Sequence, residues 1–377
     1  MKDILKRNET YLIDGCDVNI TRKLGEGGYK TVYAADVLFP GDLKATRQAI
    51  AINHRSHPNF CREAEVLEGS RLKGANIMDG PYELVDKKGH AHLVAMGDVV
   101  QGQSLDALMR TTNSLPTDKT AEVMGQVARS LHSAHRDGFV HLDIKPENVM
   151  CSTNGDCTLI DWGMVQKQGF KTPLIIGTPA FISPEMASLD SKTVDSKMDV
   201  YSAGLMMEEL ANGKIRDRCD PKLNFDISDQ QWQGYDEMSK NRGQSTTRDP
   251  LLSLTMQRAT EFDPFKRGTA LDMMTDLSAF PEARKHYDAE DRSEIVSNLV
   301  ERTKDLNRRR PVLDAAAARG MLADLPIDHP KRMQLEAIEK LAPPPQTISP
   351  QQIKAIMRSS QATIDYEMNP PSRSMKA

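Results

Sequence analysis

Two short apolar segments separated by a strong turn signal constrain the fold of this 377-residue chain more than any other feature. Val149-Met150 and Cys157–Ile160 are rich in residues that favour β-strands, and Asn154-Gly155-Asp156 lies between them. The pattern predicts a β-hairpin. Because this hairpin begins directly after Asn148 and ends directly before Asp161, its open end brings an amide and a carboxylate side chain together.

The residues around the hairpin carry groups that suit phosphoryl transfer. His141–Asn148 reads HLDIKPEN, and Asp161 begins an Asp-Trp-Gly tripeptide. During phosphoryl transfer, charge spreads over the phosphate oxygens, so a protein has to position a hydroxyl, hold Mg²⁺ and supply cations. Asp143 and Lys145 offer a base and a cation, and the oxygens of Asn148 and Asp161 are hard ligands for Mg²⁺. Each residue alone could be an ordinary turn residue, but the set at this spacing favours the chemistry.

These residues resemble the catalytic loop and metal-binding tripeptide of eukaryotic-type serine/threonine protein kinases, over about residues 18 to 280. Further matches follow in the family's order, at Gly177-Thr178-Pro179, Ser183-Pro184-Glu185, Asp199–Gly204 and Asp263–Arg267. The resemblance implies that Asp143 is the base and that Lys145 neutralises the phosphate in transfer. It implies equally that Asn148 and Asp161 hold Mg²⁺ and that the nucleotide is ATP.

The resemblance also implies the fold class, which is α+β. We expect a two-lobed protein-kinase fold with a small β-rich N-lobe, a larger, mainly helical C-lobe and a helical C-terminal extension. The predicted divisions are an N-terminal segment at 1–17, a kinase domain at 18–282 and a helical, partly disordered extension at 283–377, with the lobes meeting near residues 98 and 99.

Several elements of that domain can be placed individually. Apolar residues at helical spacing predict a helix from Lys119 that stops at Gly138, and a largely buried helix over Asp199–Ala211. By resemblance, Asp199 ties its helix to the catalytic loop, and Glu185 forms a structural ion pair with Arg267.

A glycine-rich stretch lies ahead of the catalytic loop and reads as strand, turn and strand. Glycines let backbone N–H groups approach phosphates closely, although a plain hairpin turn has the same pattern. The resemblance assigns nucleotide contacts to Leu24, Gly25, Gly27, Gly28, Val32 and Ala51. It places the hinge between the lobes within Leu93–Leu105, with the adenine edge near the backbone of Asp98 and Val100, and Gly97 beside an open back pocket.

One expected lysine is missing. The predicted second strand ends in Asn53, where the family has a lysine for the inner phosphates. The stretch GYKTVY resembles the with-no-lysine kinases, in which a glycine-loop lysine replaces it, and this makes Lys30 the substitute cation. A flexible ammonium can reach one point from different backbone origins. Lys44, His54 and Arg55 remain alternatives, and Lys44 ranks lower because its surroundings are turn-like.

The acidic partner of this lysine should lie on the following helix. Glu63 is the preferred residue, because Val66 and Leu67 then follow three and four residues later along an inward face. Glu65 is the alternative.

Composition excludes several classes of protein. A net charge of −4 implies no strong field for nucleic acid or anionic membranes, and no apolar run is long enough to insert into a membrane. Five scattered cysteines, an odd number, suggest reduced thiols and a cytoplasmic setting.

The sequence therefore predicts an ATP- and Mg²⁺-dependent kinase that acts on Ser or Thr of protein substrates, with a C-terminal extension suited to docking a partner. Leu142 stands where the family commonly has an Arg, which argues against strict activation by phosphorylation, although Thr172 is a candidate phosphorylation site. Two alternatives remain. A nucleotide-binding pseudokinase scaffold is favoured by Asn53, and a small-molecule kinase is disfavoured by Glu185 and Arg267.

Overall fold

The computed structural model describes residues 4–26, 30–53, 62–67, 72–86, 89–187, 192–213, 247 and 249–288, of which 62, 64, 65, 250 and 282–288 are described by their backbone alone. The chain divides into two compact units, Met1–Lys285 and His286–Ala377. Gly27, Gly28, His54, Arg55 and the part of the predicted extension after residue 288 lie outside the described residues.

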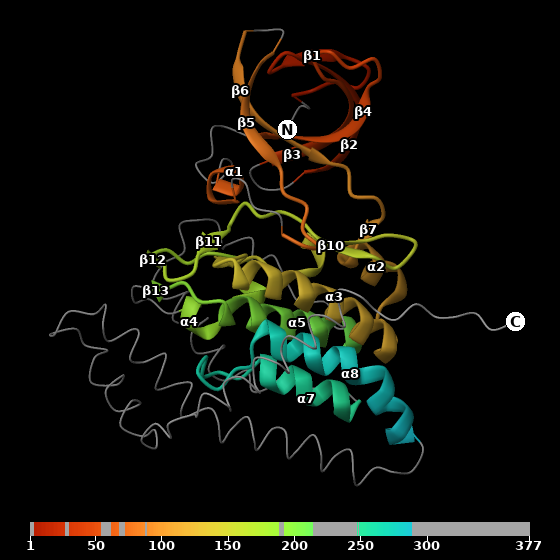
Figure 1. Ribbon diagram of the computed structural model, residues 1–377, viewed down its shortest axis with the longest axis vertical. Helices are drawn as coiled ribbons and strands as arrows, with labels where there is room; N and C mark the ends of the chain where they lie inside the picture. The colour runs from red at the N-terminus through yellow and green to blue at the C-terminus, as the bar shows by residue number, and fades with distance from the viewer. Residues whose placement is uncertain are drawn as a thin grey trace, which may run out of the picture. The chain divides into compact units, whose positions relative to one another are not determined.

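A six-stranded antiparallel sheet, in the order β1-β2-β3-β4-β6-β5, forms the N-lobe (Figure 1). Its strands are β1 (Thr10–Ile13), β2 (Cys16–Glu26), β3 (Lys30–Leu38), β4 (Thr46–Asn53), β5 (Asp79–Val85) and β6 (Ala91–Asp98). Alternation of apolar and polar residues along β1 and β2 gives the sheet one buried face, where Ile13, Val18 and Ile20 are almost fully enclosed.

The sheet reaches further toward the N-terminus than the predicted boundary at residue 18. Strand β1 pairs with the start of β2, and Leu5 and Tyr11 are buried in the same core as Ile50. Burial of these apolar side chains ties residues 4–17 to the lobe.

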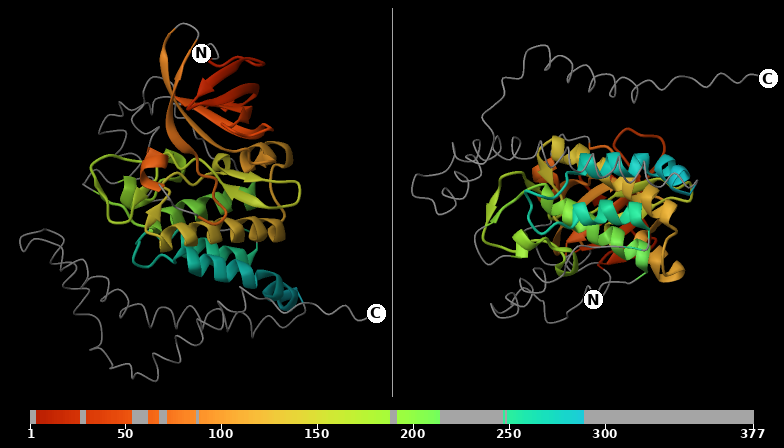
Figure 2. Two further views of the ribbon diagram at one scale, coloured as in Figure 1. Left: turned by 45° about the horizontal axis from the view of Figure 1, so that its top comes forward. Right: turned by 90° about the horizontal axis from the view of Figure 1, so that it is seen from below.

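Helices dominate the C-lobe, as the resemblance predicts. The helices of the described chain are α1 (Arg62–Leu67), α2 (Leu105–Thr112), α3 (Thr117–Arg136), α4 (Pro184–Ala187), α5 (Lys197–Asn212), α7 (Pro250–Ala259) and α8 (Ala270–Asp288), with the 3₁₀ turns η2 (Pro146–Asn148) and η3 (Pro179–Phe181). Helix α1 contacts β5 of the sheet. The longer helices α3 and α5 lie side by side below the sheet (Figure 2).

The two predicted C-lobe helices are confirmed. Val123, Val127 and Leu131 of α3 are buried on its inward face, and Gly138 follows the helix with a positive φ of 82°. Helix α5 is buried nearly all round and ends at Gly213, which has the left-handed φ of 70° that suits glycine after a helix.

The predicted hairpin is also confirmed. It consists of β9 (Val149–Cys151) and β10 (Cys157–Leu159), with Gly155 at a positive φ of 89° in the turn. Strand β7 (Gln103–Ser104), which follows the hinge, pairs with the outer edge of β9 and completes a three-stranded sheet.

The segment between the hairpin and α5 is held by short strand pairs and apolar packing. β8 (Phe139–Val140) pairs with β11 (Gln166–Lys167), and β12 (Lys171–Thr172) pairs with β13 (Lys192–Thr193). Thr172 is only 3% exposed and accepts a hydrogen bond from the backbone of Leu174. The candidate phosphorylation site is therefore enclosed in this structure.

The expectation of reduced thiols is wrong for one pair of cysteines. Cys151 and Cys157 are opposite each other on β9 and β10 and form a disulfide. A count of scattered cysteines could not show this, because the pairing follows from the register of the hairpin. Cys16 is a free, buried cysteine.

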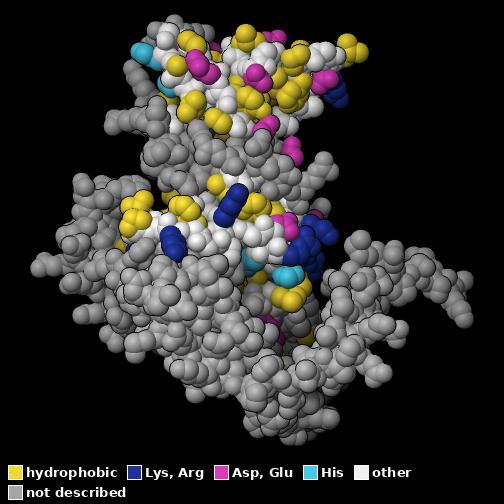
Figure 3. All heavy atoms as spheres, turned by 60° about the vertical axis from the view of Figure 1, so that its left-hand side comes forward, with side chains coloured by type: hydrophobic (Ala, Val, Ile, Leu, Met, Phe, Trp, Pro, Cys, Tyr) yellow, Lys and Arg dark blue, Asp and Glu magenta, His cyan; other side chains and the backbone are white. Residues whose placement is uncertain are grey.

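The described helices include none that is both long enough and apolar enough to cross a membrane. On the face shown in Figure 3, most acidic side chains lie on the upper described part of the surface and most basic ones on the lower described part, with hydrophobic side chains on both.

Candidate active site

Asp143, Lys145 and Thr178 form a closed triangle of hydrogen bonds. The Lys145 ammonium donates to Asp143 Oδ2 at 2.7 Å, and the Thr178 hydroxyl donates to Asp143 Oδ1 at 2.6 Å. Lys145 also donates to Thr178 Oγ1 at 2.7 Å. The carboxylate is thereby fixed in orientation beside a cation, which suits a group that has to accept or orient a hydroxyl proton.

Asn148 is oriented by the same carboxylate. Its amide nitrogen donates to the backbone oxygen of Asp143 at 2.8 Å and to Asp143 Oδ2 at 3.1 Å. Since the nitrogen is used in this way, the amide oxygen remains the atom that Asn148 can present to a cation. The donor set of this oxygen and the Asp161 carboxylate fits Mg²⁺, which prefers one or two carboxylates, other oxygens and substrate phosphates.

The hairpin brings Asp161 to the same region. The Ile160 N–H donates to the backbone oxygen of Asn148 at 2.9 Å, and Asp161 follows with a positive φ of 63°. This backbone conformation is uncommon for residues other than glycine, although aspartate tolerates it better than most.

Lys30 pairs with Asp161. The ammonium lies 2.6 Å from Asp161 Oδ1, and both side chains are largely enclosed. Burial favours the neutral lysine, but the charges of Asp161 and Glu63 outweigh it and raise the pKa of Lys30 above its ordinary value. For Asp161, burial acts to raise the pKa of the carboxyl, yet the Lys30 charge brings it below its ordinary value. Both groups are therefore charged at neutral pH.

The predicted acidic partner lies close enough to act on Lys30. Glu63, on α1, is 5% exposed and accepts a hydrogen bond from the Met78 N–H at 2.8 Å. Burial raises the pKa of Glu63 to about 7, and the Lys30 charge opposes that rise. The side chain of Glu65, the alternative, is outside the described residues.

Of the alternative cations, Lys44 is the one that the structure describes, and it does not lie at the site. Lys44 is exposed in the loop between β3 and β4, next to Leu43, which is fully exposed. His54 and Arg55 are outside the described residues. Lys30 is thus the proposed cation that the structure places against Asp161.

The predicted adenine-facing residues lie on adjacent strands. Val32 of β3 is opposite Ala51 of β4, which is opposite Ala95 of β6. Ala51 and Ala95 form a small apolar cluster against which Val32 and Leu93 pack. Small side chains at these positions suit a flat aromatic ligand.

The remaining predicted contacts border this cluster. Gly25 is opposite Val32 in the ladder, and Leu24, at the same end of β2, is 38% exposed. At the hinge, the backbone oxygen of Asp98 accepts a hydrogen bond from the Asn76 side chain at 2.9 Å, and Val100 is half-buried.

The space beside Gly97 is filled. A Cβ atom placed on Gly97 would lie 3.3 Å from Cγ of Met78, and Met78 packs against the Ala51–Ala95 cluster. Met78, from the segment directly before β5, therefore lies next to Gly97, where the open back pocket was predicted. Sequence reasoning missed this because Met78 is far from Gly97 along the chain.

His141 and Trp162 form a buried contact next to Asp143. His141 is buried, its ring lies 4.5 Å from that of Trp162, and its Nδ1 accepts from the Asp143 N–H at 3.2 Å. Burial lowers the pKa of His141, so the ring is neutral and able to accept this bond. The sequence marked His141 only as part of the motif, and its buried contacts are not visible in the motif.

Two scaffold predictions from the resemblance are confirmed. The Asp199 carboxylate accepts hydrogen bonds from the backbone N–H groups of His141 and Leu142, each at 2.8 Å. Arg267 is fully buried and donates to both carboxylate oxygens of Glu185, at 2.6 and 3.0 Å. Leu142 has a positive φ of 66°, and the bonds to Asp199 hold this strained turn in place.

Comparison with known proteins agrees with this arrangement. Residues 18–277 match the family model described as a protein kinase domain. Similar proteins include a serine/threonine-protein kinase, PknA, of Corynebacterium glutamicum, 29% identical over 220 residues, which are 56% of this chain and 46% of that protein. PknL of Mycobacterium tuberculosis is 31% identical over 201 residues, 52% of this chain and 49% of its own length.

PksC of Streptomyces coelicolor, also a serine/threonine-protein kinase, is 28% identical over 269 residues, 67% of this chain and 47% of that protein. The chain thus spans about half the length of the curated relatives it matches. Because the family model covers well over half of this chain, and because the catalytic-loop, hairpin and scaffold contacts are all in place, the chain belongs to the protein kinase family.

Proposed function

We propose that this chain is a serine/threonine protein kinase that transfers the γ-phosphate of ATP to protein hydroxyl groups. The observation that carries the proposal is the pairing of Lys30 with Asp161 next to the triangle of Asp143, Lys145 and Thr178. It joins a cation from the N-lobe to a potential metal ligand of the C-lobe. Phosphoryl transfer requires that combination.

In the proposed reaction, the substrate hydroxyl oxygen forms a bond to the γ-phosphorus while the bond from that phosphorus to the bridging oxygen breaks and ADP leaves. Asp143 orients the hydroxyl and takes up its proton. Lys145, 2.7 Å from Asp143, offsets charge on the phosphate in transfer. Mg²⁺ held by Asn148 and Asp161 would neutralise further charge on the phosphates.

Lys30 takes the part of the missing strand lysine in this proposal. It is opposite Asn53 in the β3–β4 ladder, so its ammonium starts from a backbone position directly beside the one the family uses. Glu63 lies on the adjacent helix and interacts electrostatically with Lys30. The charged pair would hold the ammonium ready for the inner phosphates.

The alternative of a pseudokinase scaffold rested on Asn53 alone. It is disfavoured by the ordered contacts of Asp143, Asn148 and Asp161, which a scaffold that only binds nucleotide would not need. Docking of a partner on the extension at 283–377 stays part of the proposal and awaits a binding experiment.

The proposal is tested with purified full-length protein, labelled ATP, Mg²⁺ and a basic protein acceptor that contains Ser and Thr. Wild-type protein should transfer label to Ser or Thr, whereas Asp143→Asn and Asp161→Ala should lose at least about 100-fold in rate, as expected when charge stabilisation is removed. Lys119→Met, on an exposed ion pair of α3, is the matched control. Nucleotide binding without transfer in the wild type would support the scaffold instead.

A further inference from the structure

The disulfide occupies a specific position in the hairpin ladder. Cys151 and Cys157 form a pair flanked by the bond from the Ser152 N–H to the Asp156 oxygen, so they sit at a non-hydrogen-bonded position. Side chains are closest together at such positions, and the two Cα atoms here are 4.2 Å apart. The backbone register alone therefore keeps the two sulfur atoms adjacent.

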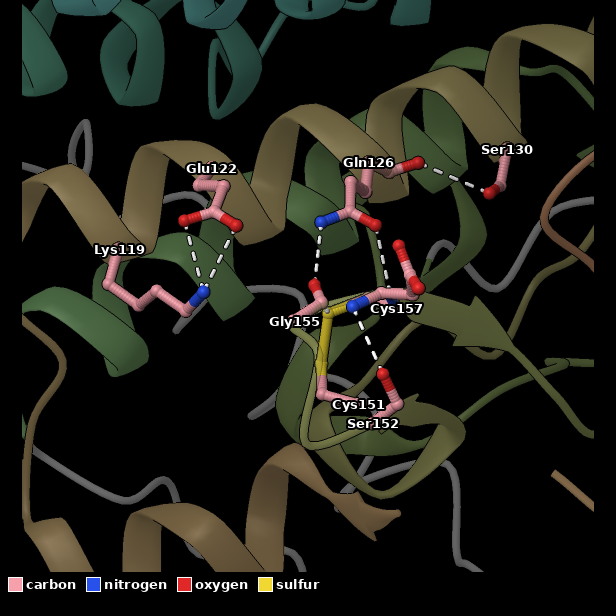
Figure 4. The surroundings of a disulfide bond; sticks show 9 residues. Lys119, Glu122, Gln126, Ser130, Cys151, Ser152, Gly155 and Cys157 are labelled. Carbon is pink, nitrogen blue, oxygen red and sulfur yellow. Dashed lines mark hydrogen bonds and ion pairs between the residues drawn. A yellow bond between two sulfur atoms is a disulfide. The ribbon is translucent and has the colours of Figure 1, made fainter. Parts of the chain in front are cut away.

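Other contacts hold this register independently of the disulfide (Figure 4). The Gln126 side chain of α3 bonds to the turn on both sides, donating to the Gly155 oxygen and accepting from the Cys157 N–H, each at 2.9 Å. The Asp156 N–H donates to the Ser152 hydroxyl at 3.2 Å. A reduced hairpin would thus keep its fold and its two thiols in reach of each other, which reversibility requires.

The two sulfur-bearing residues differ in exposure. Cys157 is 8% exposed, while Cys151 is half-buried. A thiolate reductant would therefore attack the sulfur of Cys151. Exposed disulfides of proteins are typically the labile ones.

The hairpin is connected to both halves of the nucleotide site. At its open end, the bond between Ile160 and Asn148 precedes the potential metal ligand Asp161. On the β10 side, the Asn76 N–H donates to the Leu159 oxygen at 2.9 Å, and the Asn76 side chain bonds the hinge oxygen of Asp98.

The β9 side is connected to the hinge as well. Cys151 itself pairs with Gln103 of β7. The preceding Gly102 has a positive φ of 121°, and a Cβ there would lie 2.1 Å from the Cys151 oxygen, so the post-hinge backbone packs directly on this cysteine. A change in how rigidly the hairpin is held would therefore affect both the hinge backbone and the potential metal ligands.

We propose that Cys151 and Cys157 are a reversible thiol–disulfide site whose redox state sets the affinity of this kinase for Mg²⁺ and ATP. The inference rests on the proposed function for the identity of the nucleotide. A dithiol reductant attacks the Cys151 sulfur, the bond between the two sulfurs breaks, and Cys157 leaves as a thiolate that takes up a proton. The second thiol of the reductant then releases Cys151, so two electrons and two protons reach the protein and the reductant becomes a disulfide.

The direction of the coupling follows from the ordering of the hairpin. Hydrogen bonds keep the register in both redox states. The covalent cross-link further limits the motion of the two strands next to Asn148 and Asp161, so less conformational entropy is lost when the oxidised protein binds its ligand. The oxidised form therefore binds more tightly. Linkage is reciprocal, so the nucleotide must favour the disulfide by the same factor, and couplings of this kind amount to about fivefold or more.

The test equilibrates full-length protein with mixtures of reduced and oxidised dithiothreitol and measures the Cys151–Cys157 disulfide by thiol labelling and peptide mass. The measurement is repeated with saturating Mg²⁺ and a non-hydrolysable ATP analogue. We expect the ratio of reduced to oxidised reagent at the midpoint to rise about fivefold or more with nucleotide. An unchanged midpoint, or a disulfide that does not form at all, overturns the inference.

Variants separate this pair from the other cysteines. The triple variant Cys16→Ser, Cys61→Ser and Cys219→Ser keeps the pair and should keep the full nucleotide-dependent shift. Cys157→Ser should have one constant affinity for the analogue, equal to that of reduced wild type, at every reagent ratio. If Cys157→Ser still responds to the reagent, the pair is not the sensor.

The outcomes also distinguish this inference from the proposed function. A protein that transfers phosphate but shows no nucleotide-dependent midpoint leaves the function standing and removes the redox coupling. A protein that shows the shift without transferring phosphate keeps the coupling and loses the kinase activity.

Discussion

Lys30 is directly opposite Asn53 in the antiparallel ladder of β3 and β4, and its ammonium reaches Asp161 in the C-lobe at 2.6 Å. In the proposed function the two residues exchange the usual roles of their strands, because the neutral amide of Asn53 stands where the family has a cation. Neighbouring positions of a ladder have side chains on the same face of the sheet. A lysine on β3 can therefore supply, at the same site, the charge that the family places on β4.

The first prediction concerns this exchange. Lys30→Met should lower the rate of phosphoryl transfer at least about 100-fold, because a charge-stabilising group is lost. Adding Asn53→Lys to that variant should restore part of the rate, because the new ammonium would extend from the position on β4 that is opposite residue 30. Steady-state kinetics with ATP and the protein acceptor measure both effects.

Lys44→Met is the matched control, because Lys44 is exposed in a loop. It should have the wild-type rate. Wild-type activity of Lys30→Met, or a severe loss in Lys44→Met, would show that another group faces the inner phosphates.

The second prediction concerns stability and pH. Burial raises the pKa of Glu63 to about 7 in the folded protein, against an ordinary value of 4.5. Between these values the folded protein holds a proton that the unfolded chain has released, so the contribution of Glu63 to the free energy of unfolding falls as pH rises from about 4.5 to about 7. Urea unfolding of wild type and Glu63→Gln over this range should show a difference between them that grows with pH, in favour of the variant.

Activity should have the opposite dependence on the same group. The charged Glu63 carboxylate attracts the Lys30 ammonium, so the wild-type rate should rise as pH increases through about 7. Glu63→Gln should lack that rise and be slower than wild type at pH 8. Parallel pH–rate curves for the two proteins would remove Glu63 from the site.

The third prediction concerns Thr178. Its hydroxyl bridges Asp143 and Lys145, at 2.6 and 2.7 Å. Hydrogen bonds to charged groups contribute about 1.5–3 kcal/mol, so Thr178→Ala should lower kcat by roughly 10-fold to 100-fold and leave the KM for ATP nearly unchanged. Thr178→Ser keeps the hydroxyl and should recover most of the rate. Equal kcat values for the Ala and Ser variants would show that the hydroxyl is not needed.

The fourth prediction concerns the ion pair of Arg267, which is fully buried, with Glu185, whose side chain is 21% exposed. Arg267→Met leaves the Glu185 carboxylate without the guanidinium that it bonds twice, and removing one partner of a buried pair costs about 3–5 kcal/mol of unfolding free energy. Urea denaturation should show a correspondingly lower midpoint.

Arg136→Met is the comparison for that variant, because the pair of Arg136 with Asp137 is exposed. Such a pair contributes at most about 1 kcal/mol. Similar destabilisation by the two substitutions would contradict a scaffold role for Arg267.

The sequence was sufficient for the features that depend on residues close together in the chain. The turn at Gly155 and the strands on either side define the hairpin, and the hairpin brings Asn148 and Asp161 together. Helices α3 and α5 could likewise be predicted, because the spacing of their apolar residues and their terminal glycines are local signals.

Only the tertiary structure decided how distant segments meet. The contact of Lys30 with Asp161 joins residues 131 positions apart, Met78 fills the space beside Gly97, and Thr178 completes the triangle around Asp143. The disulfide differs from these contacts, because its two cysteines are only six residues apart in the predicted hairpin, but the pairing depends on the strand register, which the turn signal alone did not specify. Local patterns specify the backbone of each element, whereas these contacts depend on packing and electrostatics between elements that the chain order alone does not place.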